Sequence, residues 1–229
     1  MTAPPDLLTA ARRAMDEKTK PPGSLGRLED WAVQVAVLQG TLSPRVDRSR
    51  VIVFAADHGV TTEGVSAYPS QVTAEMMHNF GRGGAAINCL ARSNGLDLEV
   101  IDVGVNADLD DIPVLVHAKV RRGSRNFLWE PAMTPEERQA AWKAGAAAVE
   151  RARAAGAQAV GLGEMGIGNT TAAAALLSAL TGAPPEQTVG RGTGVDEAGL
   201  ARKREVVAAA LARRRPSPED PLGCLEAVG

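Results

Sequence analysis

The sequence predicts an α/β fold, with a doubly wound, mostly parallel sheet in a Rossmann-like three-layer arrangement and a small helical lobe from the N-terminal region. Apolar runs rich in β-branched residues alternate with helical segments of about ten to twenty residues. Acidic, histidine or glycine residues directly follow three of these runs, where parallel sheets bind their ligands. We expect the helical lobe at residues 1–45 and the α/β domain at residues 46–229.

The first half of the chain supplies two helices before its first strand. Apolar residues at helical spacing predict helices over 5–20 and 24–39, separated by the breaker "PPGS". "RVIVFAADHG" then predicts a buried strand over 51–56. A helical segment over 71–93 is interrupted near "GRGG", "LEVIDVGV" predicts a second buried strand, and "VLVHAKV" predicts an edge strand.

The second half repeats this alternation. "TPEE" at Thr134 predicts a capping box that opens an alanine-rich helix extending to about Ala155. "AQAVGLG" predicts a third buried strand, and helices are expected over 170–181 and 196–215.

Composition argues against several classes of partner. The chain has 229 residues, a net charge of −2 and only 3% aromatic residues, which favours neither nucleic acid nor an anionic membrane. The N-terminus lacks the apolar core of a signal peptide, and no apolar run is long enough for a bilayer. Cys89 and Cys224 lie far apart and fit reduced thiols, so we expect a cytoplasmic protein.

The stretch "GLGEMGIGNTT" poses the question of which phosphate, if any, it binds. Its first six residues match G-x-G-x-x-G, but a dinucleotide site needs an acidic strand end about 20 residues later. Glu186 has that spacing yet lies in turn-forming sequence. The glycines could instead only allow close helix packing. Asn169 and Thr170 at a helix N-terminus favour an anion site.

A second glycine loop, "VGRGTGVD", precedes the last long helix. Gly190 and Gly192 alternate with other residues, so consecutive N–H groups can face one concavity. Lys203 is in reach of the same phosphate, although a lysine in "ARKRE" is more often a solvated charge. Glu164, inside the first loop, could stabilise a cationic centre or position a base; it could also simply accept hydrogen bonds from loop N–H groups.

Further candidates follow the first strand. Asp57 and His58 could form an acid–base unit, part of a metal site or a strand-end hydrogen bond. The other histidines show no spacing that completes a metal site, so we expect no metal. Tyr68 and Met76 have the spacing of core residues but could line a flat apolar pocket.

Six motifs together resemble one family. "KPPGSLGRLE", "ADHGV", "EGVSAYPSQVT", "IDVGV", "GEMGIGNTT" and "VGRGTGVD" occur in order over residues 20–229 and resemble nicotinate-nucleotide–dimethylbenzimidazole phosphoribosyltransferase. The resemblance implies a homodimer without metal or redox cofactor. It also implies transfer of phosphoribose from nicotinate mononucleotide to 5,6-dimethylbenzimidazole, which yields α-ribazole 5'-phosphate and nicotinate in cobalamin biosynthesis.

The resemblance also implies roles for the candidate residues. It assigns the phosphate and ribose to Gly166, Gly168, Asn169, Thr170, Gly190, Gly192 and Lys203. It assigns the benzimidazole to Tyr68, Met76, Met165, Asp57 and His58. The departing pyridinium leaves positive charge on the ribose, which the carboxylate of Glu164 can stabilise. The incoming imidazole must lose a proton, so a general base is needed.

The chain departs from the family in one motif. Family members carry their general-base glutamate in a G-E-G motif near the C-terminus, and this sequence contains no G-E-G. We therefore expect that glutamate beyond Gly229. The alternatives are an inactive nucleotide- or base-binding fragment that lacks the base, and a nucleotide-dependent dehydrogenase.

Overall fold

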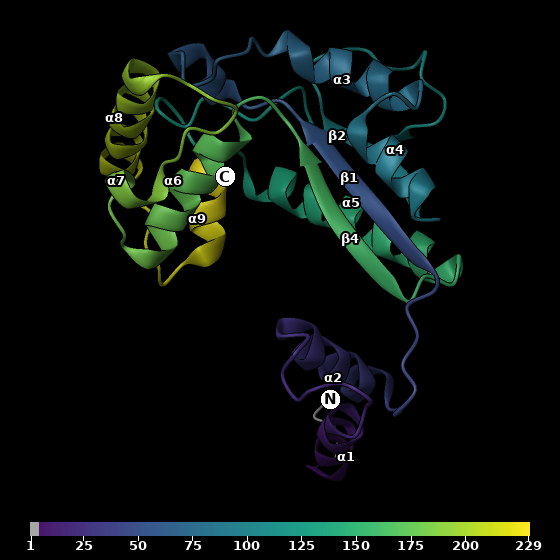
Figure 1. The fold of residues 1–229 in the computed structure, drawn as a ribbon. Coiled ribbons are helices and arrows are strands. Elements are labelled where there is room, and N and C mark those ends of the chain that lie inside the picture. Colours follow the sequence, from purple (N-terminus) through teal and green to yellow (C-terminus); the bar gives the residue numbers. More distant parts are fainter. Residues whose placement is uncertain (1–4) are drawn as a thin grey trace. The chain divides into compact units, whose positions relative to one another are not determined.

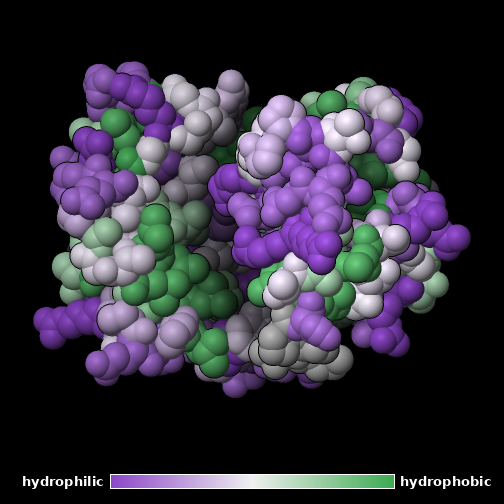
Figure 2. All heavy atoms as spheres, turned by 60° about the horizontal axis from the view of Figure 1, so that its bottom comes forward, coloured by the Kyte–Doolittle hydropathy of each residue, from purple (hydrophilic) through white to green (hydrophobic). Residues whose placement is uncertain are grey.

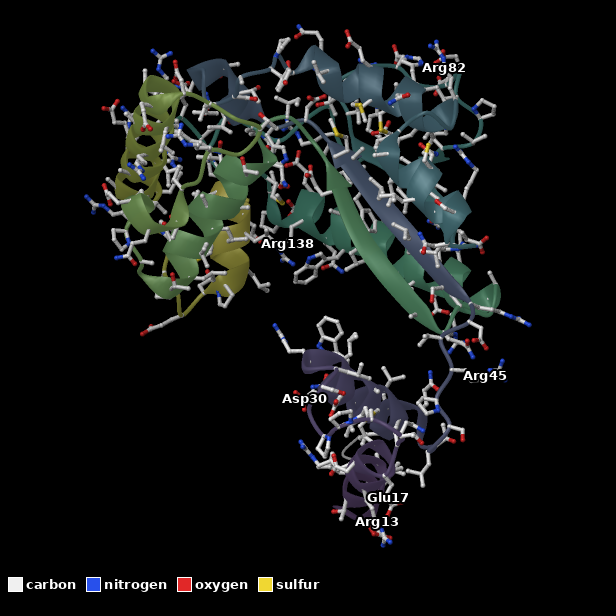
Figure 3. The ribbon with its side chains drawn as sticks, viewed as in Figure 1. Arg13, Glu17, Asp30, Arg45, Arg82 and Arg138 are labelled. Atoms are coloured by element: carbon white, nitrogen blue, oxygen red, sulfur yellow. The ribbon has the colours of Figure 1, made fainter. Side chains whose placement is uncertain are left out.

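The computed structural model describes residues 5–229, which belong to two compact units, Met1–Asp47 and Arg48–Gly229 (Figure 1). The first unit is a helical hairpin of α1 (Pro5–Asp16) and α2 (Arg27–Gln39). Its small core consists of Ala11, Val33 and Ala36, with Met15 packed against them. An ion pair of 2.6 Å joins Arg13 and Glu17 on the exposed side of α1 (Figure 3).

The second unit contains a parallel sheet. In the described part of the chain its strands are β1 (Ser49–Ala56), β2 (Asp97–Gly104), β3 (Val116–His117) and β4 (Ala159–Met165), in the order β3-β2-β1-β4. All neighbouring pairs are parallel. The predicted α/β class with a parallel sheet is confirmed, as is the position of "VLVHAKV" at an edge.

Helices make up much of the rest of this unit, and the longer ones lie close to the predicted ranges. They are η1 (Gly59–Glu63), α3 (Gln71–Gly81), α4 (Ala86–Ser93), α5 (Pro135–Ala154), α6 (Asn169–Thr181), α7 (Pro185–Thr188), α8 (Glu197–Arg214) and α9 (Pro221–Val228). The expected capping box is present at the start of α5, where Thr134 Oγ1 accepts from the Glu137 N–H and Glu137 accepts from the Thr134 N–H. The short helices η1, α7 and α9 were not predicted from the sequence. No helix in the described residues is long and apolar enough to cross a bilayer.

Helices cover both faces of the central strands. On one face, Ile52 and Ile101 pack against Ala148 and Ala152 of α5. On the other, Val53 and its neighbours pack against α3 and α4 (Figure 1), forming a core that includes Ala55, Met77, Phe80, Val100 and Ile112. Both faces of β1 are therefore buried, which its apolar sequence requires.

A separate helical cluster adjoins the sheet. Apolar residues of α6, α8 and α9 form its core, including Ala175, Val207 and Val228. The guanidinium of Arg138, labelled in Figure 3, links α5 to α9 through a 2.7 Å hydrogen bond to Glu226. Hydrophobic atoms gather on the left side of Figure 2, where Figure 1 places α6 and α9. The exposed leucines of these helices are Leu177, Leu180 and Leu222.

One expectation about the sheet is wrong. "AQAVGLG" was expected to be a buried strand, but β4 is an edge strand in the described chain, and Val160, Gly161 and Leu162 are exposed. Its apolar sequence is typical of a buried parallel strand, but burial also needs a neighbour on each side and a layer on each face. Among the described elements only β1 pairs with β4.

Candidate functional site

The candidate site lies where the order of the strands reverses. The chain proceeds from β1 outward to β3 and then returns to the other side of β1 as β4, so the carboxyl ends of β1 and β4 border a switch point. Parallel pairing brings Ala55 beside Met165. Asp57 and His58 therefore come close to Glu164 and the glycine loop that follows it.

The glycine loop joins β4 to α6. The Ile167 N–H donates to the buried Thr73 Oγ1 at 3.1 Å, which fixes the loop to α3. Gly168, with φ of +96°, turns the chain into α6, and no side chain caps this N-terminus. Because the first N–H groups of a helix lack intrahelical acceptors and carry a partial positive charge, this end of α6 favours an anion.

A buried ammonium group faces this helix end. Lys203 of α8 is only 1% exposed, and its Nζ donates to Thr170 Oγ1 at 2.7 Å and to the Gly190 carbonyl at 3.2 Å. No carboxylate of residues 5–229 pairs with it within 4.0 Å. Burial lowers the pKa of Lys203 from its usual value. A buried cation without a counter-ion is costly, so the site is electrostatically prepared for an anion.

The second glycine loop closes against these groups. Gly192 adopts φ of +55°, and a Cβ there would lie 2.6 Å from Thr170 Oγ1 and 3.0 Å from Lys203 Nζ. A side chain here would be strained by the positive φ and would displace the Thr170 hydroxyl or the Lys203 ammonium, so glycine is favoured for both conformational and steric reasons. Gly190 contributes its carbonyl to Lys203, so the two loops and α8 meet at one point.

The first glycine loop, Thr170 and Lys203 line a cavity of about 220 Å³, to which the second glycine loop contributes Thr193 and not Gly190 or Gly192. Its lining contains Val65, Ser66, Glu164, Met165, Gly166, Ile167, Gly168, Asn169, Thr170, Thr193 and Lys203. The volume is below the range of about 300–1,000 Å³ that is usual for drug-sized ligands, and suits a small phosphorylated group. Glu164, whose side chain is 40% exposed, is the carboxylate of this lining, and its Oε1 lies 3.9 Å from His58 Nε2.

The structure does not bring all the candidate base-binding residues to this cavity. Met165 lines it and also packs against the core under α3. Met76 packs against that core, and Tyr68 is 51% exposed. Asp57 and His58 line a different cavity of about 190 Å³ that extends to α5. Across residues 5–229, no three His, Cys, Asp or Glu side chains come together as metal ligands would.

Four lining residues were not singled out from the sequence: Val65, Ser66, Ile167 and Thr193. All lie within the quoted motifs. Ser66 and Thr193 are the two whose side-chain hydroxyl groups can hydrogen-bond a ligand. Isolated hydroxyl residues in loops give no periodic signal, so their position next to the glycine motifs was the only available indication.

Comparison with known proteins identifies the family of the chain. A family model described as phosphoribosyltransferase matches residues 2–229. A nicotinate-nucleotide–dimethylbenzimidazole phosphoribosyltransferase from Cupriavidus taiwanensis is 55% identical over 97% of this chain and 64% of its own length. The protein of that name from Thermus thermophilus is 55% identical over 93% of the chain and 63% of its own length.

A solved structure gives the same result. The crystal structure of CobT from Thermus thermophilus matches with a TM-score of 0.92 and 54% identity, over 98% of this chain and 67% of that one. The chain thus spans less than two thirds of the length of the curated relatives cited. Since the family model matches the chain almost from end to end, the chain belongs to this phosphoribosyltransferase family.

Proposed function

We propose that this chain transfers phosphoribose from nicotinate mononucleotide to 5,6-dimethylbenzimidazole, giving α-ribazole 5'-phosphate and nicotinate in cobalamin biosynthesis. One observation carries the proposal: the buried Lys203 ammonium faces the N-terminus of α6 without a carboxylate partner in the described chain. A phosphate there would accept hydrogen bonds from the ammonium and from helix N–H groups. The names of the relatives supply the substrates.

The roles of the remaining residues belong to the same proposal. Gly166, Gly168, Asn169, Thr170, Gly190 and Gly192 form the phosphate and ribose site with Lys203. Glu164, which lines the cavity, is placed to stabilise the positive charge that develops on the ribose as the pyridinium leaves. We assign the aromatic base to Met165, Tyr68, Met76, Asp57 and His58, on the family resemblance. Tyr68, Met76, Asp57 and His58 do not line the Lys203 cavity. The proposal therefore includes movement of their side chains when the substrate binds.

We also propose that the protein is a cytoplasmic homodimer, with a helical lobe at residues 1–45 and the transferase domain at residues 46–229. The family resemblance supports the dimer, and light scattering of the purified chain measures it. Cys89 and Cys224 are both free, which is compatible with a reducing compartment.

The decisive experiment incubates the 229-residue chain with nicotinate mononucleotide and 5,6-dimethylbenzimidazole and measures free nicotinate by chromatography. We expect nicotinate release that requires both substrates, at a rate lowered by the absence of the family's G-E-G glutamate from residues 1–229. Glu164→Gln, which keeps the shape and removes the charge, should lower turnover more than affinity for the mononucleotide. Binding of the mononucleotide without any nicotinate release would contradict the transferase proposal and leave a nucleotide-binding site.

A further inference from the structure

The imidazole of His58 lies beneath the glycine loop. His58 follows β1, its backbone forms a bridge with Ser124, and its carbonyl accepts from both the N–H and the hydroxyl of Thr61, at 3.1 and 2.9 Å. The Gly59 N–H donates to the Ser124 carbonyl at 3.1 Å. These contacts on either side of His58 fix its backbone, so its side chain has a defined direction.

The glycines of the loop leave no room for a side chain between the loop and His58. A Cβ at Gly166 would overlap the Ala56 carbonyl oxygen, and would lie 2.6 Å from Glu164 Oε1 and 3.1 Å from His58 Cδ2. A Cβ at Gly168 would lie 2.7 Å from Thr61 Cγ2 and 3.1 Å from His58 Cβ. Gly166 does not have a positive φ, so its backbone conformation does not require glycine. The absence of side chains at both positions therefore lets the loop pack closely against the end of β1, Glu164 and His58.

The two ring nitrogens have different surroundings. Nε2 lies 3.9 Å from Oε1 of Glu164, whereas Nδ1 is buried without a hydrogen-bond partner in the described residues. The neighbouring carboxylate of Asp57 accepts the Asn106 N–H at 2.8 Å through Oδ2, and its Oδ1 is buried without a hydrogen-bond partner among the described residues, so it does not accept from Nδ1. A neutral imidazole carries one N–H, and a proton on Nδ1 would be a buried, unsatisfied donor. The favoured tautomer therefore carries its proton on Nε2, toward Glu164.

We propose that His58, besides its assigned place at the aromatic base, is a positioning residue for Glu164, acting as a neutral donor whose Nε2–H directs the carboxylate at the ribose. A neutral donor fixes the orientation of Glu164 and leaves its negative charge available to the cationic ribose, which a second charge would partly cancel. The present 3.9 Å exceeds a hydrogen bond, and catalytic hydrogen bonds commonly shorten when the substrate is bound. The kinetic consequence rests on the proposed function, but the tautomer does not.

The tautomer is measured on the whole chain labelled with ¹⁵N-histidine. The sequence has three histidines, and the spectrum of His58→Gln assigns the signals of His58. We expect a protonated Nε2 and a bare Nδ1, and a shift of the Nε2–H signal in Glu164→Gln. A proton on Nδ1, or an Nε2 signal that is identical in Glu164→Gln, would overturn the proposal even if the enzyme were inactive.

The kinetic test compares two variants of matched shape, after thermal unfolding has shown that both fold. His58→Gln keeps an N–H close to the position of Nε2, and His58→Met has similar length without a donor. We expect His58→Met to lower kcat about 10- to 100-fold, as misplaced catalytic groups do, with the KM for nicotinate mononucleotide changed less than about threefold. His58→Gln should recover most of kcat. Equal losses in the two variants would mean that His58 only fills space.

If the unmodified chain releases no nicotinate, the transferase proposal fails, and the ¹⁵N spectra alone decide whether His58 donates to Glu164. The two proposals are therefore tested separately.

Discussion

Strands β1 and β4 are hydrogen-bonded neighbours with similar apolar sequences, yet their surroundings are opposite. Ile52 of β1 is fully buried, and its partner in the register, Leu162 of β4, is 76% exposed. Ile52 lies under α5, whereas β4 is the outer strand of the sheet in the described chain. Burial here is decided by the covering layers and not by the strand sequence.

The candidate site residues Glu164 and Met165 lie at the end of the exposed strand. β4 carries Glu164 and Met165 and leads into the glycine loop, whereas β1 supplies the packed support on which they rest. A rigid central strand can hold a site precisely, and a strand with an open edge leaves the site accessible to a ligand. The comparison therefore predicts that changes in β1 affect mainly folding and that changes around the end of β4 affect mainly binding.

The largest expected effect tests burial in β1. Ile52→Ala removes side-chain atoms from a core that also contains Ile101 and Ala148, so it should lower the free energy of unfolding by about 2–5 kcal/mol. The matched change Leu162→Ala in β4 should stay within about 0.5 kcal/mol, because Leu162 is largely exposed. Urea unfolding of both variants measures the difference, and similar losses would show that β4 is covered in solution.

The next effect concerns binding. Lys203→Met keeps the length of the side chain and removes the charge, so it should weaken binding of nicotinate mononucleotide about 100-fold, the scale expected for a buried charged hydrogen bond. Stability should change by no more than about 1 kcal/mol, since a buried ammonium without a counter-ion adds little to folding.

Titration calorimetry with the mononucleotide and with 5,6-dimethylbenzimidazole checks this prediction. Affinity for the base alone should stay within about twofold, because the base carries no phosphate for Lys203 to bind. A similar loss for both ligands would contradict a phosphate role for this lysine.

The pH dependence of Lys203 gives two opposite trends. Because burial lowers its pKa, Lys203 in the folded protein loses its proton at a lower pH than an exposed lysine does. Phosphate affinity should therefore be full below the lowered pKa and fall as pH rises through it. Between the lowered pKa and the usual value the unfolded chain binds more protons, so the contribution of this group to stability rises with pH.

Calorimetry with inorganic phosphate and urea unfolding, each over an alkaline pH series, measure the two trends. Lys203→Met is the control, since other groups titrate in this range: subtracting its curves isolates Lys203. Phosphate affinity with the same pH dependence in both proteins would contradict the assignment.

Local features of the sequence predicted much of this structure. The capping box at Thr134, the strand over 51–56 and the start of α6 after a glycine loop depend on neighbouring residues, and they were found from those residues. The exposure of β4 depends on which segments cover it, and no pattern within "AQAVGLG" contains that information. The burial of Lys203 did have a signal: it lies three and four residues from Leu200 and Val207, on the apolar face of α8.

The placement of the base-binding candidates was beyond local reasoning. Tyr68 and Met76 have helical spacing, which fits a core residue and a pocket residue equally well, and the structure packs Met76 against the core while it leaves Tyr68 exposed. The relation of His58 to the glycine loop depends on two segments that are far apart in the chain, and only the fold brings them into contact.

The smallest expected effect separates two glycines on the same face of β4. A Cβ at Gly163 would lie 3.0 Å from Cγ2 of Val53, and a Cβ at Gly161 would lie 3.6 Å from Cγ2 of Val51. Val53 is buried and β-branched, so it cannot easily turn away, and Gly163→Ala should cost about 1 kcal/mol. Gly161→Ala makes an ordinary contact and restricts the unfolded chain, so it should be neutral or stabilise by up to about 1 kcal/mol. Chemical denaturation midpoints of the two variants report the sign of each change. If both changes stabilise equally, the close packing between β1 and β4 does not persist in solution, and the buried strand does not constrain the exposed one.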